Sequence, residues 1–144
     1  MTDRGEGTYH VDLNEHYTVV GRPNGGYLQC VLSNAALREA ARAGSPHHHV
    51  TAMTTNYVGA PELGEAEVEV EVRRIGRGAT FVHALLRQKG QVTNESILTL
   101  GTLRPDAVNR YHDTTPFEIA PRDACPRSPR SEEHTSELQS LRHL

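Results

Sequence analysis

The segment from Glu65 to Val72 constrains the fold of this chain more than any other stretch. Its glutamates alternate in strict period two with Ala66, Val68, Val70 and Val72. Successive side chains of a β-strand point to opposite faces of a sheet, so this pattern buries one face and exposes the other. We therefore predict a strand with its valine row in the core. The glutamate row is interpreted as a solvated face, paired across strands with Arg73, Arg77 or Arg87, and is given no binding function.

A helix is predicted ahead of that strand, from Gly25 to Ala43. Its apolar residues Leu28, Val31, Leu32 and Ala35 share one stripe, and its first turns are apolar almost all round. Asn24 precedes it as the N-cap, and Gly44-Ser45-Pro46 ends it with a glycine at the C′ position. We expect this helix to be buried against a sheet.

Further β segments surround these two elements. Short ones are predicted at 9–13 and 17–20, and long ones at 50–58, 79–88 and 91–103, the last two joined by a hairpin at Lys89-Gly90. Val82, Ala84, Leu86 and Ile97 are predicted to join the core. The predicted fold class is α+β, with an antiparallel sheet wrapped around one long helix.

Composition and charge exclude several classes of partner. The chain has 144 residues and a formal net charge of -3, with no stripe of basic and aromatic residues, so we expect no nucleic-acid binding. No stretch approaches the roughly 20 apolar residues that span a bilayer, so we expect no membrane partner and a cytoplasmic location. Cys30 and Cys125 support neither a disulfide framework nor a metal site and are interpreted as reduced thiols.

The turn at Asn24, Gly25, Gly26 and Tyr27 is the candidate substrate-binding site. Each glycine costs a helix roughly 1 kcal/mol relative to alanine, so helix stability did not select the pair. One interpretation is that bare amide N–H groups at the helix start bind a carbonyl or phosphate oxygen of a ligand. The other is that the glycines let the helix pass close to a strand while Asn24 only caps it. The sequence does not favour either interpretation over the other.

The histidines are weaker candidates for a metal-binding or catalytic site. His47, His48 and His49 enter a predicted strand, where neighbours point to opposite faces, and no third ligand stands at a suitable spacing. We therefore predict no metal site. His83 alternates with Phe81 and Leu85 and is interpreted as a sheet histidine rather than a catalytic base.

Several motifs together resemble a known family. They are Pro23-Asn24-Gly25-Gly26-Tyr27-Leu28, Pro46-His47-His48-His49, Asn56-Tyr57-Val58-Gly59-Ala60-Pro61 and the run from Val68 to Arg77. In order and spacing, over about residues 9–103, they resemble the N-terminal half of the acyl-CoA thioesterase II-like double-hotdog family. The resemblance implies a single hotdog fold in this chain.

The resemblance also implies an activity: hydrolysis of acyl-CoA to free acid and CoA, with no cofactor. In that family the catalytic Asp and its Thr and Gln neighbours belong to the second hotdog. The predicted helix here carries only Glu39 as an acid, several turns from the glycine pair. The catalytic residues of this chain are therefore unknown, and we expect no hydrolysis by these residues alone.

Two other functions remain open. One is a non-catalytic hotdog that only binds or packs. A hotdog hydratase or dehydratase is a weaker alternative, because its helix should offer an acid in its first turns. With acyl-CoA as the expected ligand, the expected protein partner is a second copy of the chain or a second hotdog half, since a lone hotdog sheet leaves a strand edge unpaired.

The predicted domain organisation places the hotdog at residues 1–103. A proline-rich linker or arm follows at 104–129, where Pro121 to Pro126 resembles the family's connection between halves. Residues 130–144 resemble the translation of a sequencing adapter, so we expect an artefactual tail and a truncated gene product. On pattern alone this tail also reads as an ordinary amphipathic helix.

Overall fold

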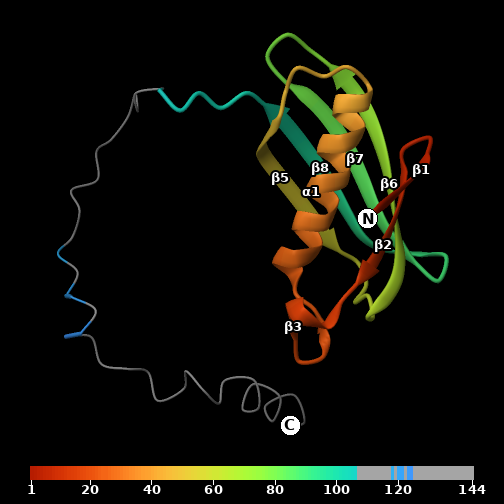
Figure 1. Ribbon diagram of the computed structural model, residues 1–144, viewed down its shortest axis with the longest axis vertical. Helices are drawn as coiled ribbons and strands as arrows, with labels where there is room; N and C mark the ends of the chain where they lie inside the picture. The colour runs from red at the N-terminus through yellow and green to blue at the C-terminus, as the bar shows by residue number, and fades with distance from the viewer. Residues whose placement is uncertain (107–117, 119, 122, 125–144) are drawn as a thin grey trace. The chain divides into compact units, whose positions relative to one another are not determined.

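The structure is a computed structural model that describes residues 1–106, 118, 120–121 and 123–124. Contacts divide the chain into a unit from Met1 to Arg104 and a second from Pro105 to Leu144. Among the described residues, the helices and strands all belong to the first unit (Figure 1). The expected tail at 130–144 and most of the expected arm, Cys125 included, lie outside the described residues.

The first unit is built on one six-stranded antiparallel sheet in the order β1-β2-β6-β7-β8-β5. Its strands are β1 (Thr2–Gly5), β2 (Thr8–Leu13), β5 (His49–Tyr57), β6 (Gly64–Ile75), β7 (Thr80–Gln88) and β8 (Gln91–Gly101). A 3-10 turn, η1 (Glu15–Tyr17), and a small two-stranded pair, β3 (Thr18–Val19) with β4 (Arg22–Pro23), link the N-terminal strands to the helix. The predicted antiparallel sheet is confirmed.

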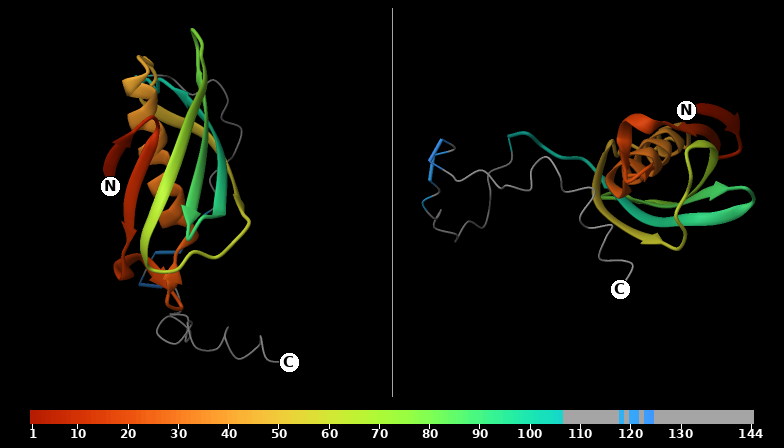
Figure 2. Two further views of the ribbon diagram at one scale, coloured as in Figure 1. Left: turned by 90° about the vertical axis from the view of Figure 1, so that its right-hand side faces the viewer. Right: turned by 90° about the horizontal axis from the view of Figure 1, so that it is seen from below.

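One long helix, α1 (Gly25–Arg42), follows β4 and lies across the inner face of the sheet. Figure 2 shows the strands curving around it. Its C-terminal end is a Schellman motif: the N–H of Ser45 bonds to the carbonyl of Ala40, that of Gly44 to Ala41, and Gly44 has φ +83°. The predicted glycine stop is confirmed.

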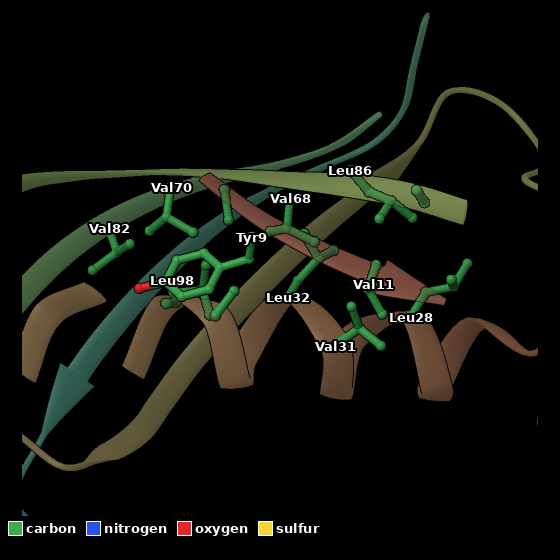
Figure 3. Packing of buried hydrophobic residues seen from close by; sticks show 14 of the residues in the cluster. Tyr9, Val11, Leu28, Val31, Leu32, Val68, Val70, Val82, Leu86 and Leu98 are labelled. Atoms are coloured by element: carbon green, nitrogen blue, oxygen red, sulfur yellow. The ribbon is translucent and has the colours of Figure 1, made fainter. Parts of the chain in front are cut away.

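The core lies between α1 and the sheet (Figure 3). Leu28 and Leu32 of α1 are at most 1% exposed and pack against the inner row of β6, which includes Val68. Val82, Ala84 and Leu86 are buried as predicted, whereas Val72 is only partly buried, beside a register shift between Val72 and Arg74. The valine row therefore faces the helix, and the glutamates face away.

The prediction that Ile97 belongs to the core is wrong. Ile97 is 61% exposed, while Leu98 and Leu100 are completely buried, so β8 presents the opposite phase to the helix. The register between β7 and β8 shifts near Thr93, and Thr93 and Asn94 are both buried although they are adjacent. A β-bulge of this kind inserts one residue and reverses which side chains point inward.

Turns account for the remaining geometry. Lys89 and Gly90 both have positive φ, at 52° and 76°, which is the type I′ geometry of the predicted two-residue hairpin. Strand β1 was not predicted, because its residues Thr2 to Gly5 are polar and all four are exposed. It extends the sheet as an edge strand beside β2.

Candidate functional site

The first turn of α1 is held by its cap. The Asn24 side chain accepts the N–H of Gly26 at 2.8 Å, and the Asn24 carbonyl accepts the N–H of Leu28 at 3.0 Å. The N–H of Asn24 itself donates to the Tyr17 carbonyl at 2.8 Å. Asn24 is therefore the N-cap, as predicted, and it ties the start of α1 to η1.

Gly25 is in contact with Tyr57, which reaches across from β5. The Tyr57 hydroxyl donates to the Gly25 carbonyl at 2.9 Å, and a Cβ on Gly25 would lie 3.1 Å from that hydroxyl oxygen. This contact explains the glycine by packing against a strand. A Cβ on Gly26 would meet only the cap oxygen of Asn24, at 3.2 Å, and Gly26 is exposed. The two glycines therefore have different surroundings.

A pocket lies on the side of α1 where the helix begins. It has a volume of about 590 Å³ and is lined by Tyr17, Thr18, Asn24, Tyr27 and Cys30. The rings of Tyr17 and Tyr27 stack with their centroids 4.9 Å apart, and Cys30 is an exposed free thiol. Of the predicted substrate-binding residues, Asn24 and Tyr27 line this pocket, while Gly25 faces Tyr57 instead.

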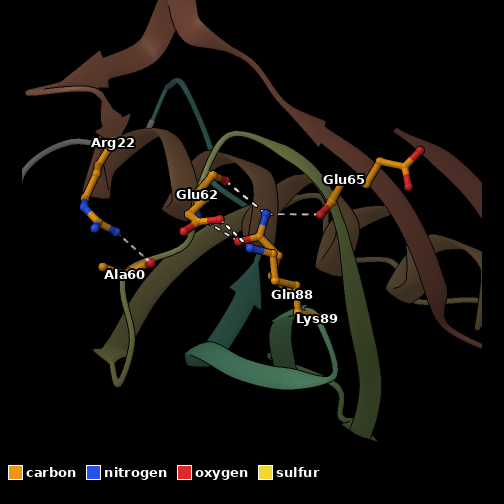
Figure 4. Close-up of polar contacts among 6 residues, drawn as sticks. All are labelled: Arg22, Ala60, Glu62, Glu65, Gln88 and Lys89. Carbon is orange, nitrogen blue, oxygen red and sulfur yellow. Dashed lines mark hydrogen bonds and ion pairs between the residues drawn. The ribbon is translucent and has the colours of Figure 1, made fainter.

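The loop between β5 and β6 is fixed beside this end of the helix (Figure 4). The Gln88 side chain accepts the N–H of Glu62 at 2.8 Å and donates to the carbonyls of Glu62 and Glu65 at 3.0 and 3.1 Å. Lys89 pairs with the Glu62 carboxylate and lowers its pKa. Arg22, in β4, donates to the Ala60 carbonyl at 3.2 Å, which connects the loop to the residues just before α1.

The only carboxylate of α1 is engaged in a buried cluster. Glu39 is 6% exposed and accepts the Tyr9 hydroxyl at 2.9 Å and the Arg42 Nε at 3.0 Å. The Arg42 guanidinium holds the pKa of Glu39 below its usual value against the opposing effect of burial. Burial, reinforced by the Glu39 carboxylate, raises the pKa of Tyr9 to about 12. Both partners thus keep Glu39 ionised and occupied.

The histidines lie apart from this site. His47 is buried, and its Nδ1 lies 2.9 Å from the Thr80 hydroxyl, while the Nδ1 of His49 accepts the N–H of Leu103. On the outer face of the sheet, His83 lies 2.9 Å from Glu95. Over the part of the chain that the structure describes, no group of three metal-binding side chains is found. No helix within that part is long and apolar enough to cross a membrane.

A polar group on the inner face of the sheet was missed by sequence reasoning. Asn94 and Ser96 of β8 are completely buried, and the Ser96 hydroxyl lies 2.9 Å from that of Thr55 on β5. Placing Ile97 in the core assigned these two residues to the outer face. Leu98 and Leu100 are also apolar and alternate with Thr99, and this pattern was the signal that could have set the correct phase.

Comparison with known proteins gives the family. Residues 13–102 match the acyl-CoA thioesterase N-terminal domain. A crystal structure from Thermobifida fusca YX, of a protein assigned as a thioesterase II, is 34% identical with a TM-score of 0.75, over 87% of this chain and 45% of that one. A hot dog protein of unknown function from Alicyclobacillus acidocaldarius is 20% identical with a TM-score of 0.69, over 88% of this chain and 46% of its own.

Two further comparisons concern ligands and length. A thioesterase from Thermus thermophilus, solved in complex with coenzyme A and Zn, is 21% identical with a TM-score of 0.60, over 69% of this chain and 86% of its own. An uncharacterized protein of Mycobacterium tuberculosis is 29% identical over 91 residues, which are 62% of this chain. The match spans only 31% of that curated relative. The fold is a hotdog, and the chain belongs to the acyl-CoA thioesterase N-terminal domain family.

Proposed function

We propose that this chain is the N-terminal hotdog of a cytoplasmic acyl-CoA thioesterase, which shapes an acyl-CoA site together with a second hotdog. The match to an N-terminal domain family supports this proposal, as does the 45% coverage of the Thermobifida relative. The Thermus relative, with the same fold, was crystallised with coenzyme A, which supports acyl-CoA as the ligand class.

The state of Glu39 is the observation that carries this proposal. A general base for water must be free to take a proton and must lie within reach of the substrate. Glu39 is the only carboxylate on α1, and it is buried, ionised and bonded to Tyr9 and Arg42. The first turn of α1 contains no acid at all. On this proposal the hydrolytic base comes from the second hotdog.

The free edge of β5 is the proposed site of pairing. Strand β5 is nine residues long and bonds only to β8, which leaves one row of its backbone groups without a strand partner within the described part of the chain. Such an edge readily pairs with a strand from another chain. Tyr57 lies on β5 and contacts Gly25, so a partner added at this edge would approach the start of α1.

Substrate contacts are proposed at Asn24, Gly25, Gly26 and Tyr27, with Gly25 contributing its backbone N–H while its Cα packs against Tyr57. The 590 Å³ pocket beside Asn24 and Tyr27 is of the size that accommodates small ligands, and the positive end of the helix dipole favours a phosphate of the ligand there. Gly26 is exposed and offers close backbone approach.

A second candidate is a packing module without thioester chemistry, and the contact between Gly25 and Tyr57 favours it. If the chain is such a packing module, Gly25 has only a structural role. The two candidates differ in ligand binding, because a pure packing module should bind octanoyl-CoA no better than free CoA.

Both candidates can be tested at the β5 edge. The variant Thr54→Lys places a charge on this exposed edge strand, and Thr99→Lys places the same charge on the adjacent inner strand β8 as a control. Sedimentation of the whole chain should show self-association that Thr54→Lys abolishes and Thr99→Lys retains. Calorimetric titration of wild type should show octanoyl-CoA binding that weakens with the edge variant. A monomeric wild type, or one that does not bind octanoyl-CoA, would reject the proposal.

A further inference from the structure

Asn94 is a buried amide without a protein partner. It is 0% exposed, and neither its Oδ1 nor its Nδ2 has a hydrogen-bond partner among the described residues. Folding strips such a group of water without replacing its hydrogen bonds, and native proteins leave few groups in that condition. Leucine fills two inward positions further along β8, Leu98 and Leu100, without this penalty. Packing alone therefore does not explain an asparagine here.

The strand register places Asn94 under the start of α1. It lies opposite Leu86 on β7 and opposite Tyr57 on β5. Directly opposed residues of antiparallel strands project from the same face of the sheet. Leu86 belongs to the core, and Tyr57 donates to the Gly25 carbonyl, so Asn94 lies on the face of the sheet that packs against α1, between a core residue and one that contacts the first turn of the helix. Because β5 is the edge strand, Tyr57 stands between Asn94 and the edge.

Neighbouring polar side chains extend this position into a site. One inward step along β8 lies Ser96, whose hydroxyl pairs with that of Thr55 at 2.9 Å. Beyond them the inner row becomes apolar at Leu98. The β-bulge near Thr93 aims Asn94 inward, and bulges frequently re-aim a side chain beside a functional site. The inner face of β8 is thus polar only where α1 begins.

We propose that Asn94 binds the carbonyl oxygen of the acyl group, a role that rests on the proposed acyl-CoA function. A carboxamide carries two N–H donors and an acceptor oxygen, whereas a thioester carbonyl only accepts. The Asn94 Nδ2 donates to the acyl carbonyl, and its Oδ1 accepts from a water or ligand donor beside it. The partial positive charge at the start of α1 favours the same oxygen. Asn94 is a binding residue here, and no bond is made or broken.

The test separates the carbonyl from the rest of the ligand. Octanoyl-CoA is compared with octyl-CoA, a thioether that lacks only the carbonyl oxygen, by calorimetric titration of the whole chain. The variant Asn94→Leu removes both polar atoms, and Asn34→Leu makes the same change at an exposed position of α1, away from the β5 edge, as the control.

Wild type and Asn34→Leu should prefer octanoyl-CoA by about tenfold, the effect of about one hydrogen bond or 1.4 kcal/mol. Asn94→Leu should lose this preference and still bind octyl-CoA within about twofold of wild type. Its thermal midpoint should rise by about 4 °C or more, because the unsatisfied amide is gone. Preference retained in a folded Asn94→Leu would overturn the proposal and leave acyl-CoA binding intact.

A second measurement tests the carbonyl site even if the chain binds no CoA ligand or the Asn94→Leu variant does not fold. Octanamide, which carries a carbonyl but no CoA, is titrated into isotope-labelled wild-type chain. The side-chain NH₂ signals of Asn94 should shift, while those of Asn34 should not. If no CoA ligand binds but the Asn94 signals shift, the proposed function fails and the carbonyl site stands. Unshifted Asn94 signals would contradict the site itself.

Discussion

The contact between Gly25 and Tyr57 offers a quantitative test of why α1 opens on two glycines. In Gly25→Ala the new Cβ would lie 3.1 Å from the Tyr57 hydroxyl oxygen and 3.3 Å from its ring. Tyr57 is 49% exposed, so we expect its side chain to move aside and lose the 2.9 Å bond to the Gly25 carbonyl. Losing that bond and the ring packing should cost about 1.5 kcal/mol. The higher helix propensity of alanine should raise the unfolding free energy by about 1 kcal/mol.

The net expectation is a loss of about 0.5 kcal/mol in unfolding free energy for Gly25→Ala alone. In a Tyr57→Ala background the contact is already absent, so the same change should stabilise the chain by about 1 kcal/mol. The coupling free energy between the two positions should therefore be about 1.5 kcal/mol.

Urea unfolding of the two single variants and the double variant measures this coupling. Gly26→Ala is the matched control, since its Cβ would meet only the Asn24 cap oxygen at 3.2 Å. Its coupling to Tyr57 should lie below about 0.3 kcal/mol. If the coupling between Gly25 and Tyr57 is also below about 0.3 kcal/mol, the packing explanation is refuted and the ligand-binding interpretation of Gly25 is favoured.

Three further predictions concern the rest of the fold. Gly7→Ala should lower the unfolding free energy measured in urea by about 2 kcal/mol or more, because Gly7 has φ +78° and a Cβ there would overlap the Val70 carbonyl oxygen. Gly5→Ala is the control: Gly5 has φ +86° but nothing within 4 Å of a Cβ, so it should lose clearly less. Equal losses in the two variants would refute the clash. The raised pKa of Tyr9 stabilises the fold fully below pH 10.0, and this contribution should disappear as the pH rises toward about 12; unfolding free energies of wild type and Tyr9→Phe that fall in parallel over this window would contradict it. Ile97→Thr should change stability by less than about 0.5 kcal/mol, and a loss above about 1 kcal/mol would place Ile97 in the core after all.

The elements governed by local signals could be predicted from the sequence. The helix was located by its Asn24 cap and its Gly44 stop, and β6 by the alternation of valine and glutamate. The hairpin at Lys89-Gly90 follows from the positive φ angles that such turns require. Each of these signals acts between residues close in sequence, so no tertiary information is needed to read it.

The phase of β8 was misread because Ile97 was placed in the core, although Leu98 and Leu100 on the opposite phase are also apolar. The β-bulge near Thr93, beside the inward-facing Asn94, is invisible in a period-two pattern. The polar residues turn inward at the start of α1, which is the place where we propose a ligand carbonyl binds. The rule that apolar residues face the core failed there, because a binding site needs polar side chains at inward positions where a core needs apolar ones.

The candidate site itself was only partly predictable. Asn24 and Tyr27 do line a pocket, but its other side includes Tyr17, which stacks on Tyr27. The contact of Gly25 with Tyr57 joins residues 32 positions apart, and that of Tyr9 with Glu39 joins residues 30 apart. Pairings of this length depend on how the sheet curves around the helix, and no spacing in the sequence encodes them.

The central claim is that this hotdog binds acyl-CoA but takes its hydrolytic base from a second hotdog. Release of free CoA thiol from saturating octanoyl-CoA tests it most directly, with the whole Thermobifida fusca relative assayed alongside. We predict that the present chain releases thiol no faster than buffer while the relative turns over. Thiol release by this chain at a rate comparable to the relative would contradict the claim, because it would require a base within these residues.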